Sequence, residues 1–407
     1  MSGKFGLLGR KLAHSWSPQI HNLLCGYEYG LHEVEPEELA DFLKNTDLAG
    51  MNVTIPYKKD VVPFCTELSE AARAIGSVNT LVRREDGWFG DNTDYAGFVA
   101  MTEQCGVDVK GRKALVFGTG GASLAVLAAL RDLGAEPIVS ISRSGPDNYD
   151  NLDRHADAEI LVNTTPLGMY PHTGISPVEL KDFPVCKAVL DVVYNPLRTR
   201  LLLDAEALGI PHAGGLTMLV AQARRSAEQF ADISIPDSRV AEIVKALEGQ
   251  MENIILIGMP GSGKSAVGKR LAPILGRPFI DADDVLVQNA GMTIPEIFAA
   301  EGEEGFRRRE TETLAELGKR SGIILATGGG CITRPENYPL LHQNGRIFWI
   351  QRDLNNLPTE GRPLSQKNDL AELYERRKEL YAAFADHIIV SDEDFSHSIK
   401  KIREALL

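Results

Sequence analysis

The sequence predicts an α/β protein with a two-lobed N-terminal part and a P-loop domain at the C-terminal end. Short apolar and β-branched runs alternate with helical patterns along almost the whole chain, which is typical of parallel α/β folds. A glycine-rich turn between a strand and a helix occurs twice, at 118–123 and at 258–265. The length of 407 residues suits two or three domains of roughly 150 residues each.

The first hundred residues predict a lobe in which strands and helices mix. The dipeptide Asp86-Gly87 between two β-rich runs predicts a hairpin. In chain order we expect a strand at 4–9, a helix after Pro18, strands at 31–35 and 50–55, and hairpin strands at 78–84 and 87–91.

Two further β/α series follow and divide the rest of the chain. The second series is expected to have strands within 113–117, 136–142, 158–165 and 187–194, then helices at 215–230 and 235–249. The third has strands at 253–257, 279–283, 322–327, 346–351 and 387–391. The join near 248–252 lacks a Pro, Ser or Gly tract, so we expect a close tether. The predicted domains are 1–105 completed by helices 216–248, then 106–215, then 252–407.

Composition limits the classes of function. The formal net charge is -13, which argues against a general binder of nucleic acid or anionic membranes. The five cysteines include no CxxC pair, which fits a reducing compartment and offers no metal framework. The N-terminus has no apolar stretch of signal-peptide length, and the longest uncharged run is too short for a membrane span. We therefore expect a soluble, cytoplasmic protein that has neither nucleic acid nor a membrane as a partner.

The strongest local motif is the phosphate loop Gly258–Ser265, which fits GxxxxGK[ST]. It follows an apolar strand and opens a helix, as the motif requires. Its backbone N–H groups converge on phosphate oxygens, Lys264 neutralises phosphate charge, and the Ser265 hydroxyl is suited to Mg²⁺. This part of the chain is predicted to bind a nucleoside triphosphate.

Charged residues after this loop indicate a phosphoryl acceptor that carries a carboxylate. Asp281 and Asp283 end a strand, where ligands of open α/β sheets bind; one suits the metal's water shell and the other an acceptor hydroxyl. The run Arg307, Arg308 and Arg309 offers bidentate carboxylate recognition. A solvated helix face is the alternative for such a run, and we expect it to hold for two of the three.

In this order the features resemble shikimate kinase over residues 252–407. The resemblance implies ATP and Mg²⁺, with Asp283 as acceptor base, Asp281 and Ser265 at the metal, and Lys264 in catalysis. It also implies substrate contacts from Arg307, Gly329, Gly330 and Arg377, and nucleotide contacts from Gly261, Ser262, Gly263, Lys264, Ser265, Ala266 and the lid residue Arg362. Glu379 departs from the proline usual in this family, and the family's adenine-stacking arginine has no counterpart before GRPLS.

The earlier turn, Gly118-Thr119-Gly120-Gly121-Ala122-Ser123, resembles a dinucleotide-binding turn with Ser123 at the third glycine. An NAD-preferring fold places an acidic residue at the end of the next strand. Here that position carries Arg143 flanked by two serines, which favours the 2′-phosphate of NADP. A plain surface arginine is the alternative.

Four polar clusters precede this turn: HSWSPQIHN, NVTIPYK, VNT and DNTD. Taken singly, each has an ordinary explanation. Ser15 and Ser17 suit a helix cap, Lys58 a solvated cation and DNTD a turn. His14 and His21 are assigned to packing or hydrogen bonding rather than to catalysis.

Together and in this order, the four clusters closely resemble shikimate dehydrogenase over residues 4–248. The resemblance implies a substrate-binding lobe facing an NADP lobe, with Lys58 and Asp94 as the catalytic pair. Substrate contacts fall on Ser15, Ser17, Thr54, Lys58, Asn79, Asp94, Tyr194 and Gln222. NADP contacts fall on Gly118, Thr119, Gly120, Gly121, Ala122, Arg143, Thr164, Met169 and Gly215.

Elementary chemistry supports the catalytic pair independently of the resemblance. Hydride transfer to a ketone creates an alkoxide, which needs a proton and a nearby positive charge. A lysine supplies both, and a neighbouring carboxylate keeps it oriented and protonated. The leading hypothesis is a bifunctional enzyme that reduces 3-dehydroshikimate with NADPH and phosphorylates the resulting shikimate with MgATP. The alternatives are a quinate dehydrogenase joined to another small-molecule kinase, and a non-catalytic nucleotide-sensing regulator.

Overall fold

The computed structural model describes residues 3–12, 15–354, 367–391 and 394–406. The chain divides into two compact units. The first unit comprises Met1–Met169, Ile175–Asn195 and Leu201–Ala246, and the second comprises Tyr170–Gly174, Pro196–Arg200 and Leu247–Leu407.

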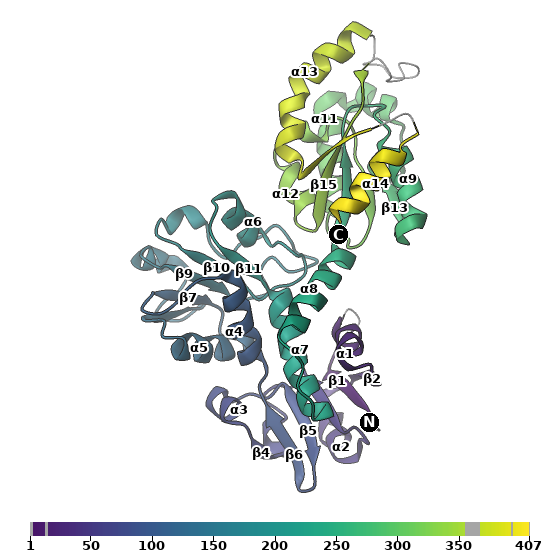
Figure 1. The fold of residues 1–407 in the computed structure, drawn as a ribbon. Coiled ribbons are helices and arrows are strands. Elements are labelled where there is room, and N and C mark those ends of the chain that lie inside the picture. Colours follow the sequence, from purple (N-terminus) through teal and green to yellow (C-terminus); the bar gives the residue numbers. More distant parts are fainter. Residues whose placement is uncertain (1–2, 13–14, 355–366, 392–393, 407) are drawn as a thin grey trace. The chain divides into compact units, whose positions relative to one another are not determined.

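The first lobe of the first unit is built on a six-stranded sheet (Figure 1). Its elements are β1 Phe5–Gly9, α1 Ser17–Cys25, β2 Tyr29–Glu33, α2 Leu39–Asn45, β3 Gly50–Val53, β4 Cys65–Leu68, α3 Glu70–Ile75, β5 Thr80–Arg84 and β6 Gly87–Asp91. The strand order is β2-β1-β3-β5-β6-β4, in which β3, β5 and β6 pair antiparallel and the other pairs are parallel. The hairpin predicted at Asp86-Gly87 is confirmed. Helix α1 begins at Ser17 rather than after Pro18, because proline is well suited to the first helical turn.

The second lobe is a five-stranded parallel sheet of order β11-β10-β9-β7-β8. The elements of this lobe and of the helices between the two lobes are α4 Asp94–Cys105, β7 Ala114–Phe117, α5 Gly121–Asp132, β8 Ile138–Ile141, β9 Ile160–Asn163, β10 Ala188–Asp191, α6 Arg200–Ala207, β11 His212–Gly214, α7 Gly215–Ala231 and α8 Ser238–Met251. Strands β7, β9 and β10 are buried along their whole length, as expected of a parallel sheet covered on both faces. Helix α7 packs along α4 and also contacts α1 and β5 of the first lobe (Figure 1). These two helices therefore hold the lobes of the first unit together.

The second unit contains a five-stranded parallel sheet of order β13-β14-β12-β15-β16. Its elements are β12 Asn253–Ile257, α9 Lys264–Leu275, β13 Phe279–Asp281, α10 Ala282–Ala290, α11 Ile294–Leu317, β14 Ile324–Ala326, α12 Asn337–His342, β15 Gly345–Gln351, α13 Lys367–Phe384, β16 His387–Val390 and α14 Ser396–Ala405. Separate apolar clusters cover its two faces, one including Leu325 and Trp349 and the other Leu256 and Phe348. The phosphate loop, Asp281 and the glycines after β14 all follow the carboxyl ends of neighbouring strands. That edge is where ligands of open α/β sheets bind.

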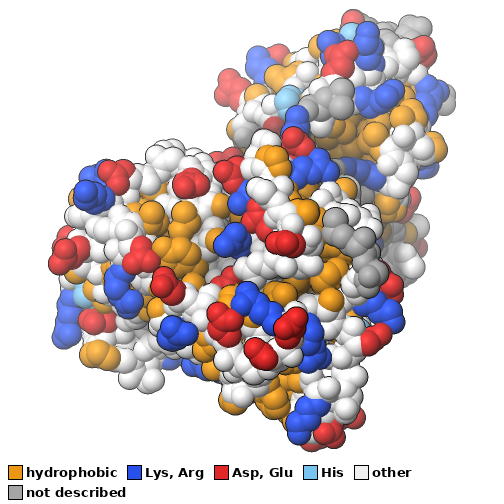
Figure 2. Space-filling model, turned by 60° about the horizontal axis from the view of Figure 1, so that its bottom comes forward, with side chains coloured by type: hydrophobic (Ala, Val, Ile, Leu, Met, Phe, Trp, Pro, Cys, Tyr) orange, Lys and Arg blue, Asp and Glu red, His pale blue; other side chains and the backbone are white. Residues whose placement is uncertain are grey.

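The remaining regular elements are short 3-10 helices at Pro36–Glu38, Val62–Phe64, Tyr149–His155, Leu180–Asp182 and Cys331–Thr333. Helix α8 ends at Met251 and β12 begins at Asn253, so one residue separates them. Among the described helices, none is both long and apolar enough to cross a bilayer. On the face drawn in Figure 2, basic and acidic side chains of the described residues are intermingled.

Candidate active sites

The first unit contains a cavity of about 570 Å³ that collects all eight substrate-contact residues expected from the dehydrogenase resemblance. Strands β1 and β3, helix α1, the start of α4 and helix α7 each contribute to its wall, and connecting segments supply the rest. The wall includes the expected Ser15, Ser17, Thr54, Lys58, Asn79, Asp94, Tyr194 and Gln222. Segments far apart in sequence therefore converge on one volume that suits a small molecule.

The Lys58–Asp94 pair lies in the wall of this cavity. Lys58 Nζ donates to Asp94 Oδ2 at 2.5 Å, and the Asp94 side chain is only 4% exposed. Asp94 is the first residue of α4, where a carboxylate is favoured by the helix dipole, and its backbone N–H donates to Asn92 Oδ1. Lys58 is thus held by a carboxylate that is itself fixed in place.

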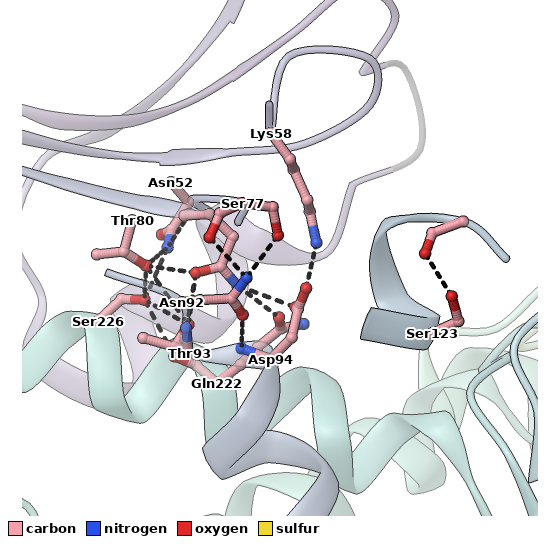
Figure 3. A network of polar contacts seen from close by, with 12 residues as sticks. Asn52, Lys58, Ser77, Thr80, Asn92, Thr93, Asp94, Ser123, Gln222 and Ser226 are labelled. Atoms are coloured by element: carbon pink, nitrogen blue, oxygen red, sulfur yellow. Dashed lines mark hydrogen bonds and ion pairs between the residues drawn. The ribbon is translucent and has the colours of Figure 1, made fainter. Parts of the chain in front are cut away.

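A buried polar network supports the pair from behind (Figure 3). Asn79 Nδ2 donates to the second carboxylate oxygen, Asp94 Oδ1, at 2.9 Å and lies 3.4 Å from Gln222 Oε1. Asn79 Oδ1 accepts from the Thr93 backbone N–H at 2.8 Å. Since each polar atom of Asn79 has a partner, the amide orientation is defined, and it leaves both oxygens of Asp94 engaged.

A second layer extends the network across the sheet to α7. Asn52 Nδ2 donates to Ser226 Oγ at 2.7 Å and to Thr80 Oγ1 at 3.1 Å, and Thr80 lies 2.9 Å from Ser226. Tyr29 OH donates to Asn52 Oδ1 at 2.8 Å. Strand β3 and helix α7 are therefore tied together by hydrogen bonds directly beside the cavity (Figure 3).

The predicted dinucleotide turn lies beside Lys58. A side-chain carbon built on Gly121 would stand 3.7 Å from Lys58 Cδ. Gly118 has a φ of 105°, and any side chain there would meet Thr164 and Thr165. Gly120 caps α5 without a side-chain hydrogen bond, so the helix N-terminus is open to a phosphate. Ser123, at the position usually held by glycine, is accommodated because its hydroxyl donates to the Gly120 carbonyl at 2.6 Å.

The other expected NADP contacts surround this turn. Arg143 is exposed just after β8, and among the described residues it makes no ion pair. Asp147, the acidic residue nearest in sequence, is paired with His155 Nε2 at 2.9 Å. Thr164 Oγ1 donates to the Phe117 carbonyl at 2.7 Å, and Met169 is 44% exposed. Gly215 starts α7 so close to Val192 that no larger residue fits.

The phosphate loop of the second unit has the backbone its motif requires. Gly258, Gly261 and Gly263 all have positive φ, and Gly263 caps α9 without a side-chain hydrogen bond. Lys264 is buried, and its Nζ donates to the loop carbonyls of residues 258 and 259 at 2.9 and 3.0 Å. The buried Ser262 hydroxyl has no partner among the described residues. A loop with an unsatisfied hydroxyl and an enclosed cation fits a phosphate group.

Two oxygens suited to Mg²⁺ lie next to this loop. Ser265 Oγ donates to Asp281 Oδ2 at 2.6 Å, and hydroxyl and carboxylate oxygens are the ligands that Mg²⁺ prefers. Asp283 lies two residues after Asp281, in the first turn of α10. Burial raises the pKa of the Asp283 carboxyl to about 6, and the carboxylates of Asp281 and Glu310 act in the same direction. Asp283 therefore has the raised basicity that suits a proton acceptor near neutral pH.

The three consecutive arginines differ in their exposure and in their partners. The Arg307 side chain is only 9% exposed and pairs with Glu310 at 2.7 Å, and it fills the space beside Gly330. The Arg308 side chain is 60% exposed, and Arg309 is turned toward Glu301, to which its NH2 group donates at 2.6 Å. Of the three arginines, only Arg307 is therefore placed at the glycine loop, residues 328–330, which follows β14.

Arg377 reaches the same loop from α13. Its NH1 group donates to the Gly329 carbonyl at 3.0 Å, and Tyr381 OH donates to that carbonyl at 2.5 Å. A side-chain carbon on Gly329 would collide with Pro260 of the phosphate loop, at 2.7 Å. The glycine loop thus contacts Pro260 of the phosphate loop as well as Arg307 and Arg377. Arg362, the expected lid residue, lies outside the described residues.

Several neighbours of these sites were not predicted from the sequence. Asn52 and His21 line the dehydrogenase cavity, and burial lowers the pKa of His21 to about 3, so its ring is neutral. Asn52 was detectable because it alternates with Thr54 along one strand face. Glu310 and Tyr381 follow Arg307 and Arg377 at helical spacings of three and four residues, which was the available signal. Lys11 and Trp16 also line the cavity. Trp16 lies between the two serines of the cluster HSWSPQIHN, whereas no pattern marks Lys11.

The fold and these sites define a two-lobed oxidoreductase of the NADP type joined to a P-loop phosphotransferase. Comparison with known families agrees: the shikimate dehydrogenase substrate binding domain matches residues 7–81, and shikimate kinase matches residues 260–407. The shikimate dehydrogenase (NADP(+)) of Clostridium perfringens strain SM101 is 37% identical over 265 residues, covering 60% of this chain and 98% of the relative. That of Salinibacter ruber is 37% identical over 273 residues, covering 59% and 96%.

Solved structures give the same answer for the first unit. A chorismate mutase/shikimate 5-dehydrogenase fusion protein from Clostridium acetobutylicum aligns with a TM-score of 0.58 at 39% identity, over 61% of this chain and 98% of that one. Shikimate 5-dehydrogenase from Thermus thermophilus, in complex with NADP(H) and shikimate, aligns with a TM-score of 0.54 at 32% identity, over 60% and 98%. The chain belongs to the shikimate dehydrogenase family and continues into a shikimate kinase domain. It therefore joins an oxidoreductase and a phosphotransferase of the shikimate pathway, which use NADP and ATP.

Proposed function

We propose that the protein catalyses two consecutive reactions: the reduction of 3-dehydroshikimate to shikimate, and the phosphorylation of shikimate to shikimate 3-phosphate. Residues 1–105 with helices 216–248 would bind the first substrate, 106–215 would bind NADPH, and 252–407 would form the kinase. The observation that carries the first reaction is the Lys58–Asp94 pair, which lies in a substrate-sized cavity beside the dinucleotide turn. Matches to two families whose reactions share shikimate support the pairing of the reactions.

In the dehydrogenase, NADPH supplies a hydride when it is bound. Lys58 would protonate the alkoxide oxygen that forms, and Asp94 would keep that lysine charged and aimed. Asn79 would orient Asp94 and, together with Thr54 and Gln222, bind ring hydroxyls. Ser15, Ser17 and Tyr194 would complete the substrate wall. The contacts of the NADP pyrophosphate would come from the turn Gly118–Ala122, and those of its 2′-phosphate from Arg143.

In the kinase, MgATP supplies the phosphoryl group when it is bound. Lys264 and the backbone of residues 261–266 would bind phosphate oxygens, and Ser265 with Asp281 would hold Mg²⁺. Asp283 would accept the proton of the acceptor hydroxyl, for which its raised pKa is suited. Arg307, Arg377 and the glycines at 329 and 330 would grip the substrate carboxylate and ring.

A two-signal assay tests the proposal. The protein is supplied with 3-dehydroshikimate, NADPH and MgATP, while NADPH loss and ADP release are followed separately. We expect NADPH loss without ATP, ADP release with added shikimate alone, and both signals in sequence with 3-dehydroshikimate. Quinate with NADP⁺ provides the comparison: a chain that oxidises quinate faster than shikimate would belong to the alternative substrate class. A folded protein with neither signal would be a nucleotide-binding regulator.

The same proposal also covers the partners of the protein and its cellular compartment. The partners would be small molecules only, and the compartment would be the cytoplasm, where a reducing environment keeps thiols free. The five cysteines are all free in the structure, and Cys331 is buried beside the glycine loop.

A further inference from the structure

The wall of the dehydrogenase cavity carries more positive than negative side chains. Two of its lining residues, Lys11 and Lys58, are cationic, and one, Asp94, is anionic. His21 also lines the cavity, but burial lowers its pKa to about 3, so it contributes no charge near neutral pH. Because Lys58 and Asp94 are paired with one another, the cavity keeps one uncompensated positive charge, and it belongs to Lys11.

Lys11 stands in the segment that leads to the two carboxylate-binding serines. Ser15 N–H donates to the Leu12 carbonyl at 3.1 Å, shortly before the start of α1. Leu12 and Thr54 both lie against the end of β1, because a side-chain carbon on Gly9 would stand 2.7 Å from each of them. Among the described residues Lys11 makes no hydrogen bond or ion pair, whereas the adjacent Arg10 is paired with Glu35. Its ammonium group is therefore available to a ligand.

The serines supply geometry to a bound carboxylate but no charge. Ser15 Oγ accepts from the Ser17 backbone N–H at 3.2 Å, which leaves its O–H able to donate to an anion. Two neutral hydroxyls replace only part of the water that a carboxylate loses on binding. A monoanionic substrate that fills a cavity with one uncompensated cation leaves no net charge behind.

We infer that Lys11 is a specificity-determining residue of the dehydrogenase, which binds the carboxylate of the substrate together with Ser15 and Ser17. This inference rests on the proposed function, since it assigns a further contact to the same substrate. It predicts an effect on binding and on the preference for an acid over an uncharged analogue. It predicts no effect on the chemical step, because Lys58, the proposed proton donor to the substrate oxygen, is unchanged.

The test compares shikimate with its methyl ester as substrates for oxidation by NADP⁺. In Lys11→Gln we expect the ratio of kcat/KM for acid over ester to fall about five-fold, which corresponds to about 1 kcal/mol. The kcat for shikimate should stay within about two-fold, and Lys11→Arg should restore most of the ratio. The KM for shikimate should rise with salt in the wild type and less so in Lys11→Gln.

Lys59→Gln is the matched control, because Lys59 is an exposed cation next to the catalytic lysine and does not line the cavity. An unchanged acid-to-ester ratio in Lys11→Gln, or an equal fall in Lys59→Gln, would overturn the inference. Calorimetry with shikimate and no nucleotide measures binding without turnover. The kinase site is the same in the wild type and in Lys11→Gln, so a difference in binding reports the dehydrogenase site. Weaker binding to Lys11→Gln would then support the contact even if the wild type failed to oxidise shikimate, a failure that would refute the proposed function alone. Identical isotherms would refute the contact.

Discussion

Replacing Asp283 by asparagine should have two opposite effects, one on the kinase rate and one on stability. The amide that replaces the carboxylate keeps the shape of the side chain but accepts no proton from the acceptor hydroxyl. Loss of general base catalysis should lower the kinase kcat by roughly 10²-fold or more at pH 7.5. ATP binding should be preserved, because the phosphate loop is untouched, and the dehydrogenase rate should not change.

The stability effect follows from the raised pKa of Asp283. The carboxyl titrates near 3.8 in an unfolded chain and at about 6 in the folded protein, because burial and two neighbouring carboxylates disfavour its charge. Between these values the native state binds more protons than the unfolded state, so this group lowers stability as pH rises from about 4 to about 6. At about 1.4 kcal/mol per pH unit, the ionised group costs about 3 kcal/mol above pH 6. Asp283→Asn should recover that stability at neutral pH and show no difference below pH 4.

Native-state hydrogen exchange of the β12 amides measures this effect in the full-length chain, since that strand reports the second unit. Asp284→Asn is the control, because Asp284 is exposed on the same turn of α10. The wild-type kinase kcat should also fall as pH drops below about 6. The reasoning would be refuted by an Asp283→Asn enzyme with near-wild-type kcat, or by equal opening free energies at pH 7.5 for Asp283→Asn and the wild type.

Three further substitutions test the assigned roles. Lys58→Ala should lower the dehydrogenase kcat at least about 10²-fold, measured by NADPH oxidation, and leave the kinase rate unchanged. Arg143→Ala should raise the KM for NADPH far more than the KM for NADH, because only NADPH carries the 2′-phosphate. Arg307→Lys should chiefly raise the KM for shikimate in the kinase assay, whereas Arg309→Lys should not, since Arg309 is bonded to Glu301 and Arg307 lies at the glycine loop.

Each of these three predictions has an outcome that would contradict it. Normal NADPH oxidation by a folded Lys58→Ala protein would remove the lysine from the chemistry. A wild type that prefers NADH would contradict the role of Arg143. Equal KM changes in the two arginine variants would mean that the run acts as a general basic field.

The sequence by itself determined the class of each half, because the motifs that bind phosphates depend on local backbone. A glycine turn between a strand and a helix creates the same anion site wherever it occurs, so Gly258–Ser265 and Gly118–Ser123 were readable from spacing alone. The hairpin at Asp86-Gly87 was equally local. The mixed first sheet was not, because pairing directions depend on which strands meet, and that is decided by packing over the whole lobe.

Only the tertiary structure decided which polar residues share a site and in what state of charge. Lys58 and Asp94 are 36 residues apart, and their 2.5 Å contact exists because the loop after β3 and the start of α4 reach the same cavity beside α7. The pKa values of Asp283 and His21 depend on burial, which is a property of the packed chain rather than of neighbours in sequence. The three arginines at 307–309 look alike in the sequence, but in the structure Arg307 lies against Gly330. Arg309 instead pairs with Glu301, which precedes the kink of α11 at Gly302. Helical spacing makes the three side chains point in different directions, but the packing of α11 against the segment that follows β14 decides which direction faces the candidate site.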